Sequence, residues 1–295
     1  MVSRTGLGNG VRQRGLRPAD EGEIDHYVRG AVVVRRAHSV PRQAGSGPTH
    51  HEFQLSILDG FELRAGGRTL LAGRGEAQRL LTLLALRDRP VSRGVVATML
   101  RPDAPEAQGL ASLRSALARL DPDVRHAIVI AGADLALTPD VSVDLRDARA
   151  FAQRLLETER PLPWTDLQQE ASQSLQALTL DLLPGWKEEW AIMESEAWRQ
   201  LRLHALDALS VHLTQAGRFA SAAGAAAAVL QSEPLRESAC AALIRVHLAA
   251  GNRSEAIRVF TEFRARLMRE LGLAPSPVLC ALLAPALPST PGDGG

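Results

Sequence analysis

The first part of the chain with a regular pattern predicts a small β-sheet, because apolar and polar residues alternate there. The alternation covers 53–58 and 61–64, with turn residues between the two runs, and 69–71 adds a third short strand. A second pair of apolar runs with a turn between them lies within 127–137 and predicts a hairpin.

Between the sheet and the hairpin, the apolar residues take the spacing of helices. Helices are predicted over 76–87, 92–100 and 106–120, and prolines separate them. Ser92 caps the second of these helices, and Val95, Val96 and Met99 are expected to face the core. A sheet, three helices and a hairpin, in this order, form a winged helix-turn-helix with an N-terminal sheet.

From 143 to 283 the pattern is that of helices almost throughout, including a long helix over 186–215. Ala216-Gly217-Arg218 recurs as Ala250-Gly251-Asn252 at a shift of 34 residues, and other small and apolar residues match at the same shift. This period is typical of the paired helices of tetratricopeptide repeats. We therefore predict a mainly α protein, with an N-terminal winged helix followed by an all-α tetratricopeptide-like domain.

The chain is thus expected to consist of four parts. They are a disordered basic arm (1–51), a winged-helix domain (52–142), a tetratricopeptide-like domain (143–283) and a disordered tail (284–295). The arm has eight arginines and four acidic residues, so it could bind phosphates without sequence specificity. A flexible tail or a misassigned start codon is the simpler interpretation of this segment.

Composition excludes several classes of function. The 295 residues carry a net charge of +1 and contain 45% hydrophobic residues, and no apolar run is long enough for a membrane span or a secretory signal. Cys240 and Cys280 cannot form a disulfide framework, which indicates a reducing cytoplasm. The single lysine, Lys187, follows Trp186 and not a glycine, so there is no Walker loop. We find no catalytic group, metal site or cofactor site.

The C-terminal part contains motifs of a known family. Leu182-Leu183-Pro184-Gly185-Trp186, Glu233-Pro234-Leu235-Arg236-Glu237-Ser238 and Glu270-Leu271-Gly272-Leu273-Ala274-Pro275 resemble the bacterial transcriptional activator domain of the SARP (AfsR-like) regulators. The resemblance implies that an OmpR-type winged helix binds direct repeats in double-stranded promoter DNA. It also implies that the protein recruits RNA polymerase.

The predicted helix over 106–120 is the candidate recognition helix. Leu110, Leu113, Leu117 and Leu120 share one side, which is expected to face the core. Gln108, Ser112, Ser115 and Arg119 share the opposite side, and Arg114 lies on the flank. Arg119 could pair with guanine and Gln108 with adenine, while the serines could reach bases or phosphates. Arg114, and Arg125 at the base of the hairpin, are better placed for phosphates.

Charge leaves a second interpretation open. Residues 53–146 contain twelve arginines and eleven acidic residues, and the hairpin has no basic residue. Few phosphate contacts imply weak DNA binding. The alternative is therefore an interaction scaffold whose winged helix binds DNA weakly or no longer binds it. A calculated surface potential around the polar side of the recognition helix would distinguish the two.

The C-terminal domain is expected to form a homodimer or to bind partners. Arg264, Arg266 and Arg269 are candidate contacts for an acidic partner, although a solvated charged face explains them more simply. A third hypothesis is a small-molecule sensor, which would need a roomy apolar pocket.

Overall fold

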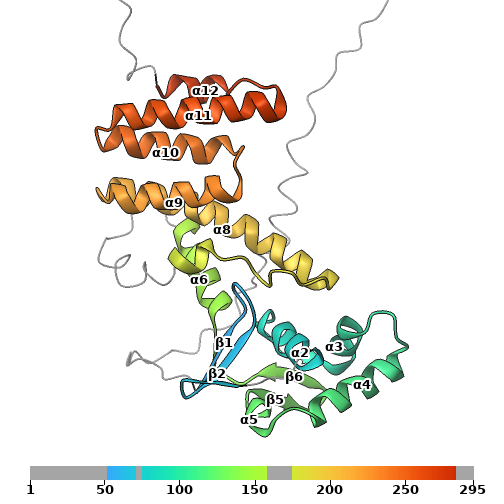
Figure 1. Ribbon diagram of the computed structural model, residues 1–295. Helices are drawn as coiled ribbons and strands as arrows, with labels where there is room; N and C mark the ends of the chain where they lie inside the picture. Colours follow the sequence, from blue (N-terminus) through green and yellow to red (C-terminus); the bar gives the residue numbers. More distant parts are fainter. Residues whose placement is uncertain (1–51, 71–74, 158–174, 284–295) are drawn as a thin grey trace, which may run out of the picture. The chain divides into compact units, whose positions relative to one another are not determined.

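The computed structural model describes residues 52–70, 75–157 and 175–283 (Figure 1). The predicted arm and the predicted tail lie outside these ranges. The fold class is confirmed, because two small sheets with the helices of a winged helix precede a series of packed helices.

The first sheet has the strand order β3-β2-β1-β7. It contains β1 (Phe53–Ser56), β2 (Glu62–Ala65), β3 (Arg68–Leu70) and β7 (Val141–Val143). The three expected strands, β1, β2 and β3, pair with one another in antiparallel orientation. β7 pairs with β1 in parallel orientation, which the sequence pattern did not predict. The helical region therefore begins at Asp144 and not at Val143, because Val143 completes a strand opposite Leu55.

The helices of the winged helix are α2 (Glu76–Ala85), α3 (Arg93–Leu100), α4 (Glu106–Ala118) and the short α5 (Pro122–Arg125). The second sheet has the order β4-β6-β5, from β4 (Val91–Ser92), β5 (Ile128–Ala131) and β6 (Asp134–Leu137). The expectation for the inward side of α3 was confirmed for Val96, which is fully buried, but was wrong for Val95, whose side chain is 49% exposed; Met99 is half-buried. β4, which no pattern indicated, pairs with β6 immediately before α3.

The C-terminal helices are α6 (Asp144–Glu157), α8 (Glu189–Gln215), α9 (Phe219–Ser232), α10 (Glu237–Ala249), α11 (Arg253–Leu271) and α12 (Pro277–Ala281). α8 begins at Glu189 and not at Trp186 as predicted. The segment before it turns back to β1 and continues its pairing, because the N–H of Leu183 donates to the carbonyl of Ile57 at 3.1 Å. Leu182 forms a bridge with Leu58 in the same segment.

The predicted repeat is confirmed in the helix pairs α8/α9 and α10/α11, which pack in succession (Figure 1). Gly217 and Gly251 occupy the same position in the two connecting turns, with φ of 71° and 77°. Only glycine adopts this backbone conformation without strain, which explains its recurrence. Ala222 and Ala256, also 34 residues apart, are both fully buried where the helices meet.

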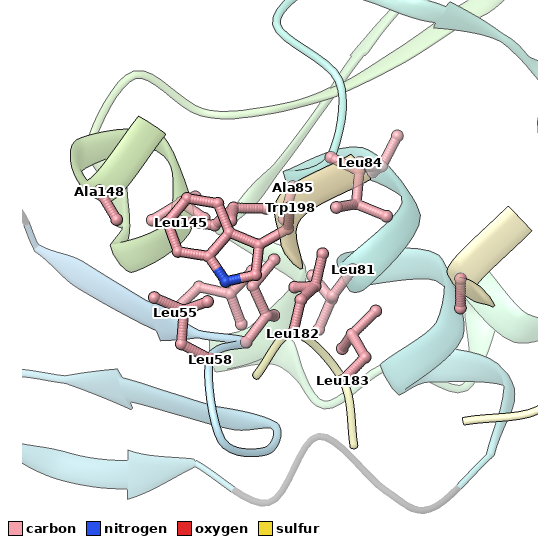
Figure 2. Close-up of a cluster of buried hydrophobic side chains, with 14 of the residues drawn as sticks. Leu55, Leu58, Leu81, Leu84, Ala85, Leu145, Ala148, Leu182, Leu183 and Trp198 are labelled. Carbon is pink, nitrogen blue, oxygen red and sulfur yellow. The ribbon is translucent and has the colours of Figure 1, made fainter. Parts of the chain in front are cut away.

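One hydrophobic core extends from the winged helix into the C-terminal helices. Figure 2 shows Trp198 of α8 among side chains from β1, α2 and α6, including Leu55, Leu81 and Leu145. The indole N–H of Trp198 donates to the carbonyl of Leu180 at 3.0 Å, so its polar atom is satisfied in the core. Burial of this side chain therefore couples both halves of residues 52–283.

Polar contacts strengthen the same junction. The guanidinium of Arg146 in α6 donates to the carbonyls of Leu84, Ala85 and Arg87 at the C-terminal end of α2, at 2.6 to 3.1 Å. A cation at this end also interacts favourably with the helix dipole. The carboxylate of Asp144 accepts from the N–H groups after β1, and burial raises its pKa. The contacts of Arg146 therefore link α6 to the end of α2, and those of Asp144 link α6 to the segment after β1.

Candidate nucleic-acid interface

Helices α3 and α4 form the helix-turn-helix. As predicted, Ser92 caps α3, because its Oγ accepts from the N–H of Val95 at 3.4 Å. α4 crosses α3 at Gly109, where a methyl group would lie 3.4 Å from the carbonyl oxygen of Ala97. Because this close contact uses one side of α4, the other side is directed away from α3.

The two sides of α4 differ as the sequence predicted. Leu113, Leu117 and Leu120 are buried, and Leu110 is half-buried. The opposite side carries the exposed side chains of Gln108, Ser115 and Arg119 and the half-buried side chain of Ser112, and Arg114 is exposed on the flank. The candidate recognition residues therefore lie on an accessible surface of one helix.

Arg119 has a neighbour that the sequence pattern did not indicate. Its Nη2 lies 3.4 Å from Oε2 of Glu76 at the start of α2, and its Nε donates to the carbonyl of Ser115 at 3.2 Å. Glu76 also pairs with Arg101. The side chain of Arg119 nevertheless remains 73% exposed. An exposed pair of this kind contributes about 0–1 kcal/mol, so Arg119 can leave Glu76 at little cost.

Arg114 and Arg125 are both exposed. Within the described ranges neither forms an ion pair. Arg114 extends from the flank of α4, and Arg125 ends α5, immediately before the hairpin. Two unpaired guanidinium groups at the border of a polar helix surface could bind phosphate oxygens.

Gln108 also lines a cavity of about 700 Å³. The loop between α3 and α4 forms one wall, and the first turn of α8, with Trp190 and Met193, forms another. The cavity is as large as known small-molecule sites. Gln108 of the winged helix and the first turn of α8 therefore line the same cavity, which the sequence did not predict.

The hairpin formed by β5 and β6 is the wing. Its turn lies against the start of α3, because the N–H of Arg93 donates to the carbonyl of Ala133 at 2.8 Å. Residues 127–143 contain no arginine or lysine, and Val129 and Ile130 are exposed. The wing therefore presents apolar and not basic side chains.

The three arginines of α11 do not form one cluster. Arg266 lies 4.0 Å from Glu270, and Arg269 lies 3.4 Å from the same carboxylate. Arg264 and Arg266 are two residues apart, which places them about 200° apart around the helix. An acidic partner could therefore contact Arg264 together with other residues, but not all three arginines on one surface.

Two kinds of feature are absent from the described residues. No helix in these ranges is long and apolar enough to cross a bilayer. No group of three or more His, Cys, Asp or Glu side chains within them is arranged to hold a metal ion. Burial raises the pKa of the Cys240 thiol to about 12, so this thiol remains protonated at neutral pH.

Comparison with known proteins gives three findings. Residues 143–285 match the family described as the bacterial transcriptional activator domain. The regulatory protein AfsR of Streptomyces griseus is 25% identical over 276 residues, which are 88% of this chain and 26% of AfsR. The chain thus spans about a quarter of that relative.

A similar fold occurs in EmbR of Mycobacterium tuberculosis, whose structure was solved in complex with a low-affinity phosphopeptide. The two chains superpose with a TM-score of 0.59 at 20% identity. The match covers 78% of this chain and 64% of the EmbR chain. At this identity the comparison shows a shared fold.

Proposed function

Because the chain is a SARP-like protein with a bacterial transcriptional activator domain, we propose that it regulates transcription by binding promoter DNA through α4. One observation carries the proposal. Leu113 and Leu117 of α4 are buried, while its polar side is exposed on the second helix of a helix-turn-helix. In proteins with this motif, the second helix lies in the major groove.

The roles of the side chains follow from their chemistry. Arg119, after it leaves Glu76, donates two hydrogen bonds to guanine, and Gln108 pairs with adenine. Ser112 and Ser115 contact bases or phosphates. Arg114 and Arg125 hold the phosphate backbone on either side. With about two or three phosphate contacts, the logarithm of affinity falls with that of salt concentration with a slope of about −2 to −3.

The partners proposed for the C-terminal domain rest on the family. We propose RNA polymerase as a partner, since SARP regulators recruit it. Arg266 and Arg269 lie near Glu270, whereas Arg264 does not. A test of partner binding should therefore substitute Arg264 before the other two arginines.

A DNA titration tests the proposal. Genomic fragments selected at low salt are labelled, and binding of the full chain is followed by fluorescence anisotropy. Arg119→Ala should lower affinity about 5- to 100-fold for the selected fragment and little for random DNA, as expected for a base contact. Arg114→Ala should weaken binding to both DNAs and reduce the salt slope by about one.

Arg258→Ala is the matched control, because it removes an arginine whose ion pairs on α11 are exposed. It should leave both affinities within about twofold, since exposed pairs contribute little. If no genomic fragment is preferred over random DNA, or if Arg258→Ala acts like Arg119→Ala, DNA recognition by α4 is refuted. The interaction scaffold then becomes the better interpretation.

A further inference from the structure

The wing has an uncharged, apolar strand at the free edge of its sheet. Among the described residues, the order β4-β6-β5 leaves β5 with a neighbour on one side only. Val129 and Ile130 are each 40% exposed. Consecutive residues of a strand point to opposite faces, so β5 presents apolar surface to solvent on both faces.

The unpaired backbone groups of β5 can be assigned. The N–H of Thr138 donates to the carbonyl of Ala127 at 2.9 Å, so Ala127 belongs to a hydrogen-bonded pair between the two arms of the hairpin. Hydrogen-bonded pairs alternate with non-bonded pairs in an antiparallel ladder, so Val129 and Ala131 also hydrogen-bond to β6. Ile130 faces Leu135, which is paired with β4 on its other side. The N–H and C=O groups of Ile128 and Ile130 therefore point away from β6, toward the free edge.

This edge lacks the features that usually block strand pairing. Proteins protect edge strands with charged residues, prolines or bulges. Residues 127–133 contain no charged residue and no proline. The register with β6 is continuous from Ile128↔Leu137 to Ala131↔Asp134, so β5 has no bulge. The strand can accept another strand without rearrangement.

We propose that β5 pairs in antiparallel orientation with β5 of a second copy of this chain. The outward N–H and C=O groups of Ile128 and Ile130 in one copy must lie opposite those of the other copy. This condition places Val129 at the centre of the paired segment. Ile128 then lies opposite Ile130 of the second copy, and the two Val129 residues face each other as a non-bonded pair. The two three-stranded sheets become one continuous sheet.

A second copy fits this edge better than DNA does. The uncharged strand neither attracts phosphates nor repels its own copy. Arg125 precedes β5 and Asp134 follows its turn. Antiparallel pairing brings the Arg125 end of one strand to the Asp134 end of the other, so opposite charges lie at each end of the pair. The interface is small, and self-association is therefore weak and concentration-dependent.

Disulfide trapping tests the register. Val129→Cys is made in the full chain together with Cys280→Ser, which removes the exposed native thiol. In a non-bonded antiparallel pair the Cα atoms lie about 4.5 Å apart, within reach of a disulfide. Mild oxidation without DNA should give a covalent dimer at least about tenfold faster than the control. The control is Val211→Cys, an exposed position on α8, in the same background.

Sedimentation equilibrium tests the hydrogen bonds. Ile130→Pro removes an N–H that points outward and leaves the bonds to β6 intact. It should lower the dimer fraction at least about fivefold, whereas Val129→Thr, which keeps the backbone donor, should lower it much less. Circular dichroism checks that each variant is folded.

Equal oxidation rates for the two cysteine variants would overturn the proposal. A chain that remains monomeric at its highest soluble concentration would also overturn the proposal. The free edge of β5 would then be a candidate site for a strand of another protein. Neither assay contains DNA, so a failure here is distinct from a failure of DNA recognition.

Discussion

Replacement of Trp198 tests whether the two halves of the protein fold as one unit. Its side chain is fully buried and contacts residues of β1, α2 and α6 (Figure 2). Removal of a large buried aromatic side chain costs about 3–5 kcal/mol, because both its transfer from water and the cavity that it leaves are unfavourable. Trp198→Ala should therefore lower the free energy of unfolding by about 3–5 kcal/mol.

A second variant separates the two contributions. Trp198→Phe keeps an aromatic ring but removes the indole N–H that donates to Leu180 at 3.0 Å. A buried carbonyl without its donor costs about 1–3 kcal/mol. Trp198→Phe should therefore lie between the parent and Trp198→Ala.

The assay is urea unfolding with one reporter in each half. Amide exchange of α2 reports on the winged helix, and amide exchange of α9, whose Ala222, Ala225 and Val229 belong to the same core as Trp198, reports on the C-terminal helices. Both reporters should shift by the same free energy, because the Trp198 side chain contributes to a shared core. Met193→Ala on the same helix is the control, since Met193 is 67% exposed and should change stability by about 0.5 kcal/mol or less.

The reasoning is refuted by either of two results. A loss below about 1 kcal/mol for Trp198→Ala would mean that the surroundings of Trp198 are not close-packed. A shift of only one reporter would mean that the two halves unfold independently. The winged helix could then be studied as an isolated domain.

Three other predictions concern charge and thiol chemistry. Glu76→Gln removes the ion-pair partner of Arg119 and a negative charge beside α4. The affinity for DNA in anisotropy titrations should therefore rise about two- to fivefold. An unchanged or lower affinity would show that Arg119 does not reach DNA. Hydrogen bonds from Arg199 lower the pKa of Glu196 from 4.5 to about 2, so its stabilising contribution is present above pH 4.5 and is lost as the pH falls toward 2. Glu196→Gln should flatten acid unfolding in this window, and equal slopes would contradict the assignment. At pH 8 a thiol reagent should modify exposed Cys280 quickly and buried Cys240 only after unfolding, because burial raises the pKa of Cys240 to about 12. Rapid modification of both thiols in the folded chain would contradict this prediction.

The candidate interface was predictable where it depends on a single helix. The period of the leucines in α4 correctly placed Leu113 and Leu117 in the core and left Gln108 and Arg119 outside. The same reasoning failed for Val95 in α3, which is exposed although its neighbour Val96 is buried. Periodicity gives the apolar side of a helix only when that side is distinct, and α3 has apolar residues around most of its circumference.

The sequence by itself determined the order of the elements, the recurrent glycines at the turns of the helix pairs, and the two sides of α4. These features depend on the conformations of neighbouring residues, and neighbours are known from the sequence. Only the tertiary structure decided that β7 joins β1, that Glu76 holds Arg119 from 43 residues away, and that Trp198 completes a core shared by both halves. Such contacts depend on how whole elements pack, because the partners come together only after the intervening chain has folded.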